Sequence, residues 1–356
     1  MKSVLIYTYS MSPYQVEFLD ELDKFSEQLC VLYHLRTERG RMWSGVAASH
    51  DHLFWRESDL QLIFRCIQRS DIVVISGYNT LSSLVLLILS RMHGKVVVFW
   101  GERFRGAQTG LISCLSYFYK RIFLSLADYC FAIGVVALHD YSKISFQTDQ
   151  TSYVPYYSKL KRFFDLELKP RKARNIVFIG EFSSRKGVDL ILGLIESCSI
   201  RLAALGFTIT FVGSGPLEKE VSRVAFNFPS LVSVKGFVPW AETHLIYEEA
   251  DIIMVPSLYD GWCLVVVEAM AAGRIVISTV NTGAAYERIK EGENGFLLAD
   301  ITTEALYEKL NDVSKLSVEK LQFIRENARR SVRDLDVSNG VNNFLKSLDE
   351  AKERSL

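Results

Sequence analysis

Short apolar runs alternate with longer amphipathic segments along the whole chain. In the first half we predict strands over 4–9, 30–35, 71–76, 95–100 and 129–133, with helices between them, for example over 13–22 and 81–92. Continuous apolar runs of this length are typical of strands that are buried on both faces, and strands that alternate with helices form parallel sheets. The pattern therefore predicts an α/β protein with doubly wound parallel sheets, which bind ligands at the carboxyl ends of their strands.

The second half repeats this rhythm, and several of its strands end in glycine. We predict strands over 175–180, 209–213 and 251–255, a short strand and turn over 234–238, and helices from 188, from 216, over 241–249 and over 264–272. Gly215 and Pro216 mark one such turn, because proline suits the first position of a helix. These strand-to-helix turns are the expected positions of ligand-binding groups.

Two carboxylates eight residues apart bracket the turn after the strand over 251–255. Asp260 falls in this turn, and Glu268 falls inside the helix that follows. The N-terminus of that helix presents backbone N–H groups and partial positive charge, which suit a phosphate. An acidic side chain beside it suits sugar hydroxyls. The segment thus indicates a ligand that is anionic at one end and hydroxylated at the other; a solvated aspartate and a helix-face glutamate are the alternative.

A pair of cations follows the strand over 175–180. Gly180 and Glu181 end this strand, and Arg185 and Lys186 stand in the next loop, directly before Gly187. Two cations in one loop either hold an anionic ligand or lie solvated on the surface.

These segments together resemble the signature of retaining glycosyltransferases of family 4. Such enzymes have the GT-B fold, in which two Rossmann-like domains face each other across a cleft, and they transfer a sugar from a nucleotide diphosphate donor. The resemblance implies that Asp260 contacts the donor sugar, Glu268 the ribose and Lys186 the diphosphate. The family often has arginine directly after the strand glycine, where this chain has Glu181. Arg185 is therefore the candidate for the missing guanidinium.

The resemblance extends to the backbone around the donor. It implies that the nucleobase lies against Phe237 and Val238, and that the diphosphate and sugar lie close to Gly180, Gly215, Gly261, Trp262, Cys263 and Leu264. Further matches occur at 281–283 and 293–296. Five matches in order over 180–295 make the family assignment specific for the C-terminal half.

The N-terminal half is implied to bind the acceptor. Its first loop carries Ser10 and Ser12, and in the family this loop faces the donor phosphates and the acceptor. After the strand over 95–100 the family often has histidine and aspartate, whereas this chain has Gly101 and Glu102. Glu102 either contacts the acceptor or the donor sugar, or forms an ordinary salt bridge with a neighbouring arginine, Arg103 or Arg105.

Length and composition predict two domains. The chain has 356 residues, 49% of them hydrophobic, which exceeds one ordinary core. We predict an N-terminal acceptor-side domain over 1–165 and a C-terminal donor-side domain over 166–335. The last helical stretch is predicted over 318–352, and the resemblance implies that its final part, 336–356, packs back on the N-terminal domain.

The chain's formal charge of zero conceals an asymmetry. It is +6 through residue 174 and −6 after it. The clearest linker is the Lys- and Arg-rich segment 159–174, which is either a solubilising connector or a contact for anionic lipid headgroups. A basic N-terminal half is consistent with docking on an anionic membrane surface.

No secretory or membrane-spanning segment is evident in the sequence. The most apolar helix candidate, 81–89, is far shorter than the roughly 20 residues that a bilayer requires. Six cysteines are scattered without a C-x-x-C pair, as expected for reduced core residues of a cytoplasmic protein. We therefore predict a cytoplasmic protein, with peripheral binding to the inner face of the plasma membrane as an extension of this prediction.

No metal or cofactor is predicted beside the donor. The six histidines lack the i, i+4 spacing of zinc sites, and Asp334-Leu335-Asp336 is interpreted as a solvated helix turn. Nothing in the sequence indicates a nucleic-acid partner. Lys186, Arg185 and a helix N-terminus are then expected to stabilise the leaving diphosphate.

The resemblance implies retaining, metal-independent transfer to a hydroxyl of a glycan or lipid-linked acceptor, in surface polysaccharide or lipopolysaccharide biosynthesis. A GT-B sugar-nucleotide epimerase and a non-catalytic nucleotide-sugar-binding protein remain alternatives. A nicotinamide oxidoreductase is disfavoured, because residues 10–13 do not provide the G-x-G-x-x-G that it requires after its first strand.

Overall fold

The computed structural model describes residues 3–37, 46–104, 111–144 and 148–355, without the side chains of 111–114 and 148. It divides the chain into two compact units, each described here by itself. Unit 1 contains the residues up to Lys159 together with those from Val337 onward, and unit 2 is Leu160–Asp336. Residues 160–165 thus belong to unit 2, and the C-terminal helix belongs to unit 1.

Unit 1 is a parallel sheet in the order β3-β2-β1-β4-β5-β6-β7. Its strands are β1 (Ser3–Ser10), β2 (Gln28–Leu35), β3 (His52–Phe54), β4 (Ile72–Ser76), β5 (Val96–Glu102), β6 (Tyr129–Ile133) and β7 (Thr151–Tyr153). Its helices are α1 (Pro13–Asp23), α2 (Leu60–Arg69), α3 (Leu81–Met92), α4 (Leu111–Ser125), α5 (Val135–Ile144) and α14 (Val337–Ser355). The predicted strands are confirmed, while the three-residue strands β3 and β7 at the two edges were missed because they are too short to show a pattern.

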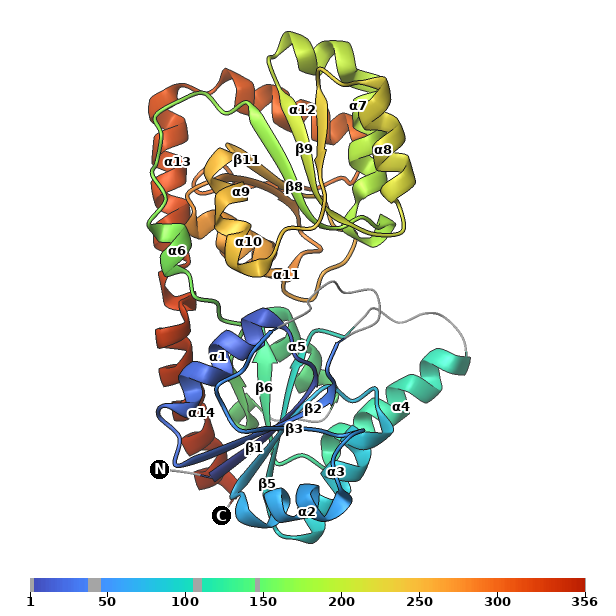
Figure 1. Cartoon of the computed structure of the whole chain (residues 1–356), viewed down its shortest axis with the longest axis vertical. Coiled ribbons are helices and arrows are strands. Elements are labelled where there is room, and N and C mark those ends of the chain that lie inside the picture. Colours follow the sequence, from blue (N-terminus) through green and yellow to red (C-terminus); the bar gives the residue numbers. More distant parts are fainter. Residues whose placement is uncertain (1–2, 38–45, 105–110, 145–147, 356) are drawn as a thin grey trace. The chain divides into compact units, whose positions relative to one another are not determined.

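Helices cover both faces of this sheet. Side chains of α2, α3, α4 and α5 pack on one face around Tyr7, Phe99 and Tyr141. On the other face α1 lies beside α14, as Figure 1 shows. There Phe344 packs edge-on against Phe18 and Trp100, with ring centroids 5.4 and 5.3 Å apart. Burial of these aromatic rings attaches the C-terminal helix to unit 1.

Unit 2 is a second parallel sheet, in the order β10-β9-β8-β11-β12-β13. Its strands are β8 (Asn175–Glu181), β9 (Thr208–Ser214), β10 (Val232–Lys235), β11 (Ile252–Val255), β12 (Ile275–Thr279) and β13 (Phe296–Leu298). Its helices are α6 (Lys161–Phe164), α7 (Val188–Ala204), α8 (Glu218–Asn227), α9 (Thr243–Glu249), α10 (Leu264–Ala271), α11 (Gly283–Arg288), α12 (Thr303–Lys315) and α13 (Val318–Ser331). The fold class predicted from the sequence, two doubly wound parallel sheets, is confirmed.

The predicted helix over 318–352 is two helices. α13 ends at Ser331, a short 3₁₀ turn follows, and α14 begins at Val337. Between them the Asp336 carboxylate accepts a hydrogen bond from the Leu160 N–H (3.0 Å), and the Val337 N–H donates to the Ser158 carbonyl (3.0 Å). These bonds to a distant part of the chain replace helical ones, so the sequence period alone did not reveal the break.

The basic segment 159–174 is folded into unit 2, so its interpretation as a linker is wrong for most of its length. The Arg171 guanidinium forms an ion pair with the buried carboxylate of Asp251 (2.7 Å). The same carboxylate accepts the backbone N–H groups of Arg174 and Asn175, both at 3.0 Å. Asp251 thus fixes this segment at the start of β11, because a buried carboxylate requires such partners.

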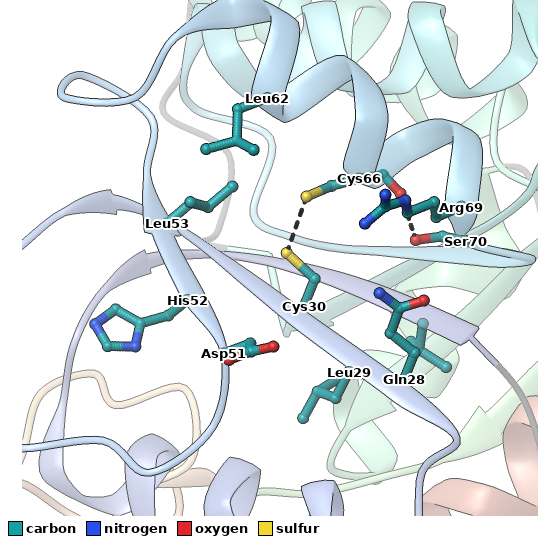
Figure 2. Close-up of a pocket in the computed structure, with 11 residues that line it drawn as sticks. Gln28, Leu29, Cys30, Asp51, His52, Leu53, Leu62, Cys66, Arg69 and Ser70 are labelled. Atoms are coloured by element: carbon teal, nitrogen blue, oxygen red, sulfur yellow. Dashed lines mark hydrogen bonds between the residues drawn. The ribbon is translucent and has the colours of Figure 1, made fainter.

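Two of the cysteines meet, although the sequence showed them as scattered. Cys30 on β2 and Cys66 on α2 lie with their sulfur atoms 3.3 Å apart in a small pocket of about 240 Å³ (Figure 2). Cys130, Cys198 and Cys263 are buried, as expected for core cysteines. Cys114 lies outside the residues whose side chains the structure describes.

Candidate functional site

The candidate donor site lies at the carboxyl edge of the sheet of unit 2. The chain runs outward from β8 through β9 to β10, and then from β11 through β12 to β13 on the other side. β8 and β11 are therefore neighbours at the point where the strand order reverses, which is where open parallel sheets bind ligands. The loops after these two strands carry Lys186 and Asp260, so the two sequence motifs meet at this point.

Backbone hydrogen bonds hold the loops together. The Leu258 N–H donates to the Arg185 carbonyl (2.9 Å), which joins the loop after β11 to the loop after β8. The Asp260 N–H donates to the Asn281 carbonyl (3.2 Å), which joins it to the loop after β12. Gly187 has φ +75°, and a Cβ there would lie 2.1 Å from the Pro256 carbonyl oxygen. Only glycine permits this approach, so the Lys-Gly pair of the sequence motif has a steric reason.

Lys186 and Asp260, 74 residues apart in the sequence, form an ion pair. Their side chains are only 18% and 12% exposed. Burial alone would lower the pKa of the Lys186 ammonium, but Cys263 and the Asp260 carboxylate outweigh it and raise the pKa above its ordinary value. Burial raises the pKa of the Cys263 thiol to about 12, so Asp260 supplies the counter-charge at neutral pH. The site therefore presents a cation and a carboxylate side by side at the start of α10.

Cys263 joins this turn to α10 in a conformation that L-residues rarely adopt. It is the N-cap of α10, with φ 75° and ψ 85°. Among the described residues it is the only non-glycine with positive φ. Backbone strain of this kind concentrates at functional sites, where the surrounding structure imposes it. Here it turns the backbone so that α10 begins directly beside Lys186 and Asp260.

Glu268 lies one turn inside α10 and is almost fully buried. Its carboxylate accepts a hydrogen bond from the Tyr247 hydroxyl of α9 (2.9 Å). Burial, and then the Glu268 carboxylate, raise the pKa of Tyr247 well above its ordinary value, so the phenol stays a donor. Phe163 of α6 packs edge-on against Tyr247, with ring centroids 5.1 Å apart. Sequence reasoning missed Tyr247, because only the packing of α9 against α10 brings it to the acid.

Arg185 is already engaged by the end of β8 and by the loop after β11. Its guanidinium forms an ion pair with Glu181 (3.3 Å) and donates to the Tyr259 carbonyl (3.3 Å). Glu181 stands where the family often has arginine, and Arg185 was expected to take over from that arginine. The ion pair shows that Glu181 instead neutralises Arg185. Both side chains are about one third exposed, so the pair is accessible to a ligand.

Some of the other residues predicted to contact the nucleotide-sugar donor lie at the carboxyl edge of the sheet, and one of them is buried. Gly180 and Gly215 lie at the ends of β8 and β9, and the Phe237 and Val238 loop follows β10 at the same edge. Phe237 is 37% exposed, which leaves a ring face for a ligand. Trp262 is fully buried, so its side chain cannot contact a nucleotide-sugar and only its backbone could. Its carbonyl accepts the Ala284 N–H (2.8 Å).

Gly261 and Leu264 flank the strained Cys263 at the start of α10. Gly261 is buried in the turn, and a Cβ on Gly283 would lie 2.1 Å from its carbonyl oxygen. The turns after β11 and β12 therefore approach closely at this point. Backbone of these two turns thus lies beside the N-terminus of α10, together with the Lys186 and Asp260 side chains.

The remaining candidates belong to unit 1. Ser12 is the N-cap of α1 with proline after it, as predicted, but its hydroxyl donates to the Gln15 side chain (2.9 Å) and does not cap the helix. Ser10 ends β1 and is buried. Glu102 ends β5, and its backbone carbonyl accepts the Tyr141 hydroxyl (2.6 Å). Of its two candidate salt-bridge partners, Arg105 lies outside the described residues.

The aspartates of the D-x-D sequence have separate partners. Asp334 forms an ion pair with Arg288 (2.9 Å), while Asp336 accepts the Leu160 N–H. Within the described part of the chain, no three His, Cys, Asp or Glu side chains converge as a metal site would require.

Comparison with known proteins identifies the domain that carries the site. Residues 161–331 match the family model described as Glycosyl transferases group 1. Unit 2 is a glycosyl transferases group 1 domain. The match includes Lys186, Asp260 and Glu268 and covers nearly the whole of unit 2.

Curated relatives of this domain are distant in sequence. WcaL of Salmonella typhimurium, a candidate colanic acid biosynthesis glycosyltransferase, is 25% identical over 199 residues, which are 53% of this chain and 48% of the relative. The glycogen synthase of Thermodesulfovibrio yellowstonii is 26% identical over 174 residues, which are 48% of this chain and 34% of the relative. The matches thus span about half or less of the length of these relatives.

Solved structures resemble the whole chain. Anabaena HepE in complex with UDP and glucose has 16% identity and a TM-score of 0.74, and the match covers 98% of this chain and 100% of that one. The lipopolysaccharide outer core galactosyltransferase WaaB has 14% identity and a TM-score of 0.69, with 97% and 99% covered. These likenesses show that the two units together have the GT-B fold around the group 1 domain.

A helix that spans a membrane requires sufficient length and hydropathy. No helix among the described residues is both long and apolar enough to cross a bilayer.

Proposed function

We propose that this protein is a retaining glycosyltransferase that moves a sugar from a nucleotide diphosphate donor to a hydroxyl of a glycan or lipid-linked acceptor. The observation that carries the proposal is the meeting of Lys186 and Asp260 at the start of α10, with Glu268 one turn inside that helix. Group 1 membership of unit 2 supports glycosyl transfer. The relatives named for colanic acid and lipopolysaccharide assembly favour a surface polysaccharide as the product.

The donor is best supported as a UDP-sugar, because the structural neighbour HepE was solved with UDP and with UDP-glucose. In the proposed complex the diphosphate lies at the N-terminus of α10, where backbone N–H groups and the Lys186 ammonium face it. One oxygen of the Asp260 carboxylate turns from Lys186 to accept hydrogen bonds from the sugar hydroxyls. Glu268, held by Tyr247, accepts the ribose hydroxyls.

In this mechanism the bond between the anomeric carbon and the diphosphate breaks as the acceptor hydroxyl attacks from the same face. Because the attack comes from the face that the diphosphate leaves, the configuration is retained, and a leaving phosphate oxygen takes the hydroxyl proton. Negative charge grows on the diphosphate in the transition state. A fixed cation and helix N–H groups stabilise that state more than they stabilise the bound donor, which is the condition for a faster reaction.

Calorimetry with UDP and a UDP-sugar tests the division of roles. Glu268→Gln should weaken the binding of both ligands. Asp260→Asn should spare or strengthen UDP binding, because it removes the partner of Lys186, and should weaken only the sugar-bearing donor. Equal losses for both ligands in both variants would show that the assignment is wrong. Tyr247→Phe is the matched variant, since it removes only the hydroxyl that holds Glu268.

Product analysis tests the reaction itself. Incubation with donor and saccharide acceptors should give a glycoside whose anomeric proton signals show the donor's configuration, and turnover should survive excess EDTA. An inverted product, or activity that depends on added Mg²⁺, would contradict retention or metal independence. A changed sugar nucleotide formed without any acceptor would identify an epimerase.

A further inference from the structure

Unit 1 contains a cavity that none of the candidate donor-site residues of unit 2 lines. It has a volume of about 800 Å³ and lies at the carboxyl ends of β1, β2 and β4. β1 pairs with β2 on one side and with β4 on the other, so the strand order of this sheet reverses at β1. Ligands of open parallel sheets bind at such a point. The cavity therefore occupies the expected ligand position of unit 1.

Aromatic rings form one wall of the cavity. Tyr9 stacks on His34, with ring centroids 5.4 Å apart and planes 26° apart, and Tyr9 remains 42% exposed. Trp55 stands edge-on to Tyr7, with centroids 6.4 Å apart. Ring faces of this kind offer apolar area to the C–H face of a sugar, while polar groups at the rim fix its orientation.

Hydroxyl groups form a connected network at the base of the cavity. The Tyr7 hydroxyl lies 2.8 Å from Thr80 Oγ1 and 2.7 Å from Ser82 Oγ. Ser82 Oγ lies 2.8 Å from His34 Nδ1. Burial, and then the charge of Arg56, lower the pKa of His34, so its ring is neutral at pH 7. The network therefore fixes the rings without placing a charge among them.

The electrostatics of the cavity favour an anion. Among the described residues that line the cavity, Arg56 is the only charged side chain, and none is a carboxylate. Its side chain is exposed and lines the cavity. The N-terminus of the twelve-residue helix α3 also opens here, with Thr80 as its cap. A helix N-terminus and a guanidinium both stabilise negative charge.

We infer that this cavity binds the terminal sugar of the acceptor, and that this sugar carries an anionic group, either a carboxylate or a phosphate. The inference rests on the proposed function, which it deepens by naming the class of acceptor. The sugar ring lies on Tyr9, which is itself stacked on His34, and the anionic group lies between Arg56 and the N-terminus of α3.

Saccharide binding to the full chain tests this without requiring turnover. Ligand-observed NMR titrations compare methyl glucuronide, glucose 6-phosphate, methyl glucoside and inorganic phosphate. We expect at least one of the two acidic sugars to bind about fivefold or more tighter than methyl glucoside, and to do so in the presence of equimolar inorganic phosphate. The stronger of the two acidic sugars identifies the group as carboxylate or phosphate.

Three variants assign the contacts. Arg56→Gln should abolish the preference for the acidic sugar and leave methyl glucoside binding unchanged. Tyr9→Ala should weaken acidic and neutral sugars alike. Arg121→Gln, which removes an exposed arginine from α4, is the matched control and should change nothing.

The inference is overturned if the neutral sugar binds as tightly as both acidic ones, if inorganic phosphate displaces the acidic sugar completely, or if Arg56→Gln keeps the preference. UDP binding to the same variants is measured in parallel and should be unaffected, because Lys186 and Asp260 are intact. Failure of the wild-type chain to bind UDP would instead count against the proposed function. The two failures are therefore distinguishable.

Discussion

At the scale of single residues, the candidate donor site depends on charges that compensate one another. Lys186 is paired with Asp260, and Arg185 is paired with Glu181. The first pair is largely buried and the second is about one third exposed, so the two cations differ in their accessibility to a ligand. Lys186 keeps its charge because its pKa is raised, and its position at the start of α10 places it where a diphosphate would bind.

Lys186→Ala should lower kcat/KM about a hundredfold, or by about 3 kcal/mol, because a fixed cation facing the leaving group is lost. Arg185→Ala should cost less than about tenfold, since Glu181 already neutralises that guanidinium. Steady-state kinetics measure both, with Lys219→Ala on α8 as a surface control. Full activity of a folded Lys186→Ala variant would remove this loop from the donor site.

Glu181→Gln provides the reciprocal measurement, made by calorimetry with UDP. Releasing Arg185 from its partner should tighten UDP binding a few-fold. An unchanged dissociation constant would show that Arg185 does not reach the diphosphate even when it is free.

The strain at Cys263 predicts an unusual order of substitutions. Cys263→Gly should change the free energy of unfolding by less than about 1 kcal/mol, because glycine adopts φ 75° freely while the loss of a buried thiol opposes that gain. Cys263→Val should destabilise by about 1–3 kcal/mol, since a β-branched side chain resists this conformation. Urea denaturation of both variants measures the difference. A valine variant as stable as the glycine variant would show that the turn is not constrained.

At the scale of elements, the contacts between β2 and α2 give two cysteines different chemistry. Cys30 donates a hydrogen bond to the Cys66 sulfur across the pocket in Figure 2. This bond lowers the pKa of Cys66 to about 7, against the effect of burial and with a smaller contribution from Arg69. The same interaction, followed by burial, raises the pKa of Cys30. Neither sequence position indicated this asymmetry, because it arises from the packing of a helix on a strand.

Alkylation of the native protein should therefore depend on pH near neutrality. A group with a lowered pKa gains its thiolate earlier as pH rises, so the rate of Cys66 modification by iodoacetamide should increase mainly between about pH 6 and 8. Peptide mass spectrometry across this range measures the rate, and Cys66→Ser serves as the control. Modification that rises only above pH 8, or that occurs first at Cys30, would contradict the hydrogen-bond direction.

At the scale of the whole molecule, the chain is two separate compact units joined at 159–160 and 336–337. Lys186, Asp260 and Glu268 belong to unit 2, while Ser10, Ser12 and the cavity with Tyr9 and Arg56 belong to unit 1. Each unit has its own core and its own strand-order reversal. We therefore propose that the donor nucleotide and the acceptor sugar bind to different units.

UDP at about a hundredfold excess over its dissociation constant should stabilise unit 2 by about 2.7 kcal/mol. Hydrogen exchange should then slow in the loops at 180–187 and 256–264 of unit 2. The loops around Tyr9 and Thr80 in unit 1 should change less. Protection that appears in unit 1 and not in unit 2 would place the nucleotide in the wrong unit and contradict the donor assignment.

The sequence by itself determined the fold class. Apolar runs that alternate with amphipathic segments bury their apolar faces as parallel strands covered by helices. It also determined the Lys186, Asp260 and Glu268 motif, since the glycines around it mark turns that only certain backbones make. Local signals sufficed for these features. They failed at the break between α13 and α14, whose cause is a bond to Leu160, far away in the chain.

Only the tertiary structure decided which charged and polar side chains pair. Lys186 with Asp260, Glu268 with Tyr247 and Asp251 with Arg171 are each joined across at least 20 residues of sequence. The same holds for the wall of Tyr9 and His34, which come from neighbouring parallel strands. Pairing energies depend on distance and burial, and neither can be known before the strands are placed side by side. The sequence supplies the groups, and the packing of the sheets decides which of them act together.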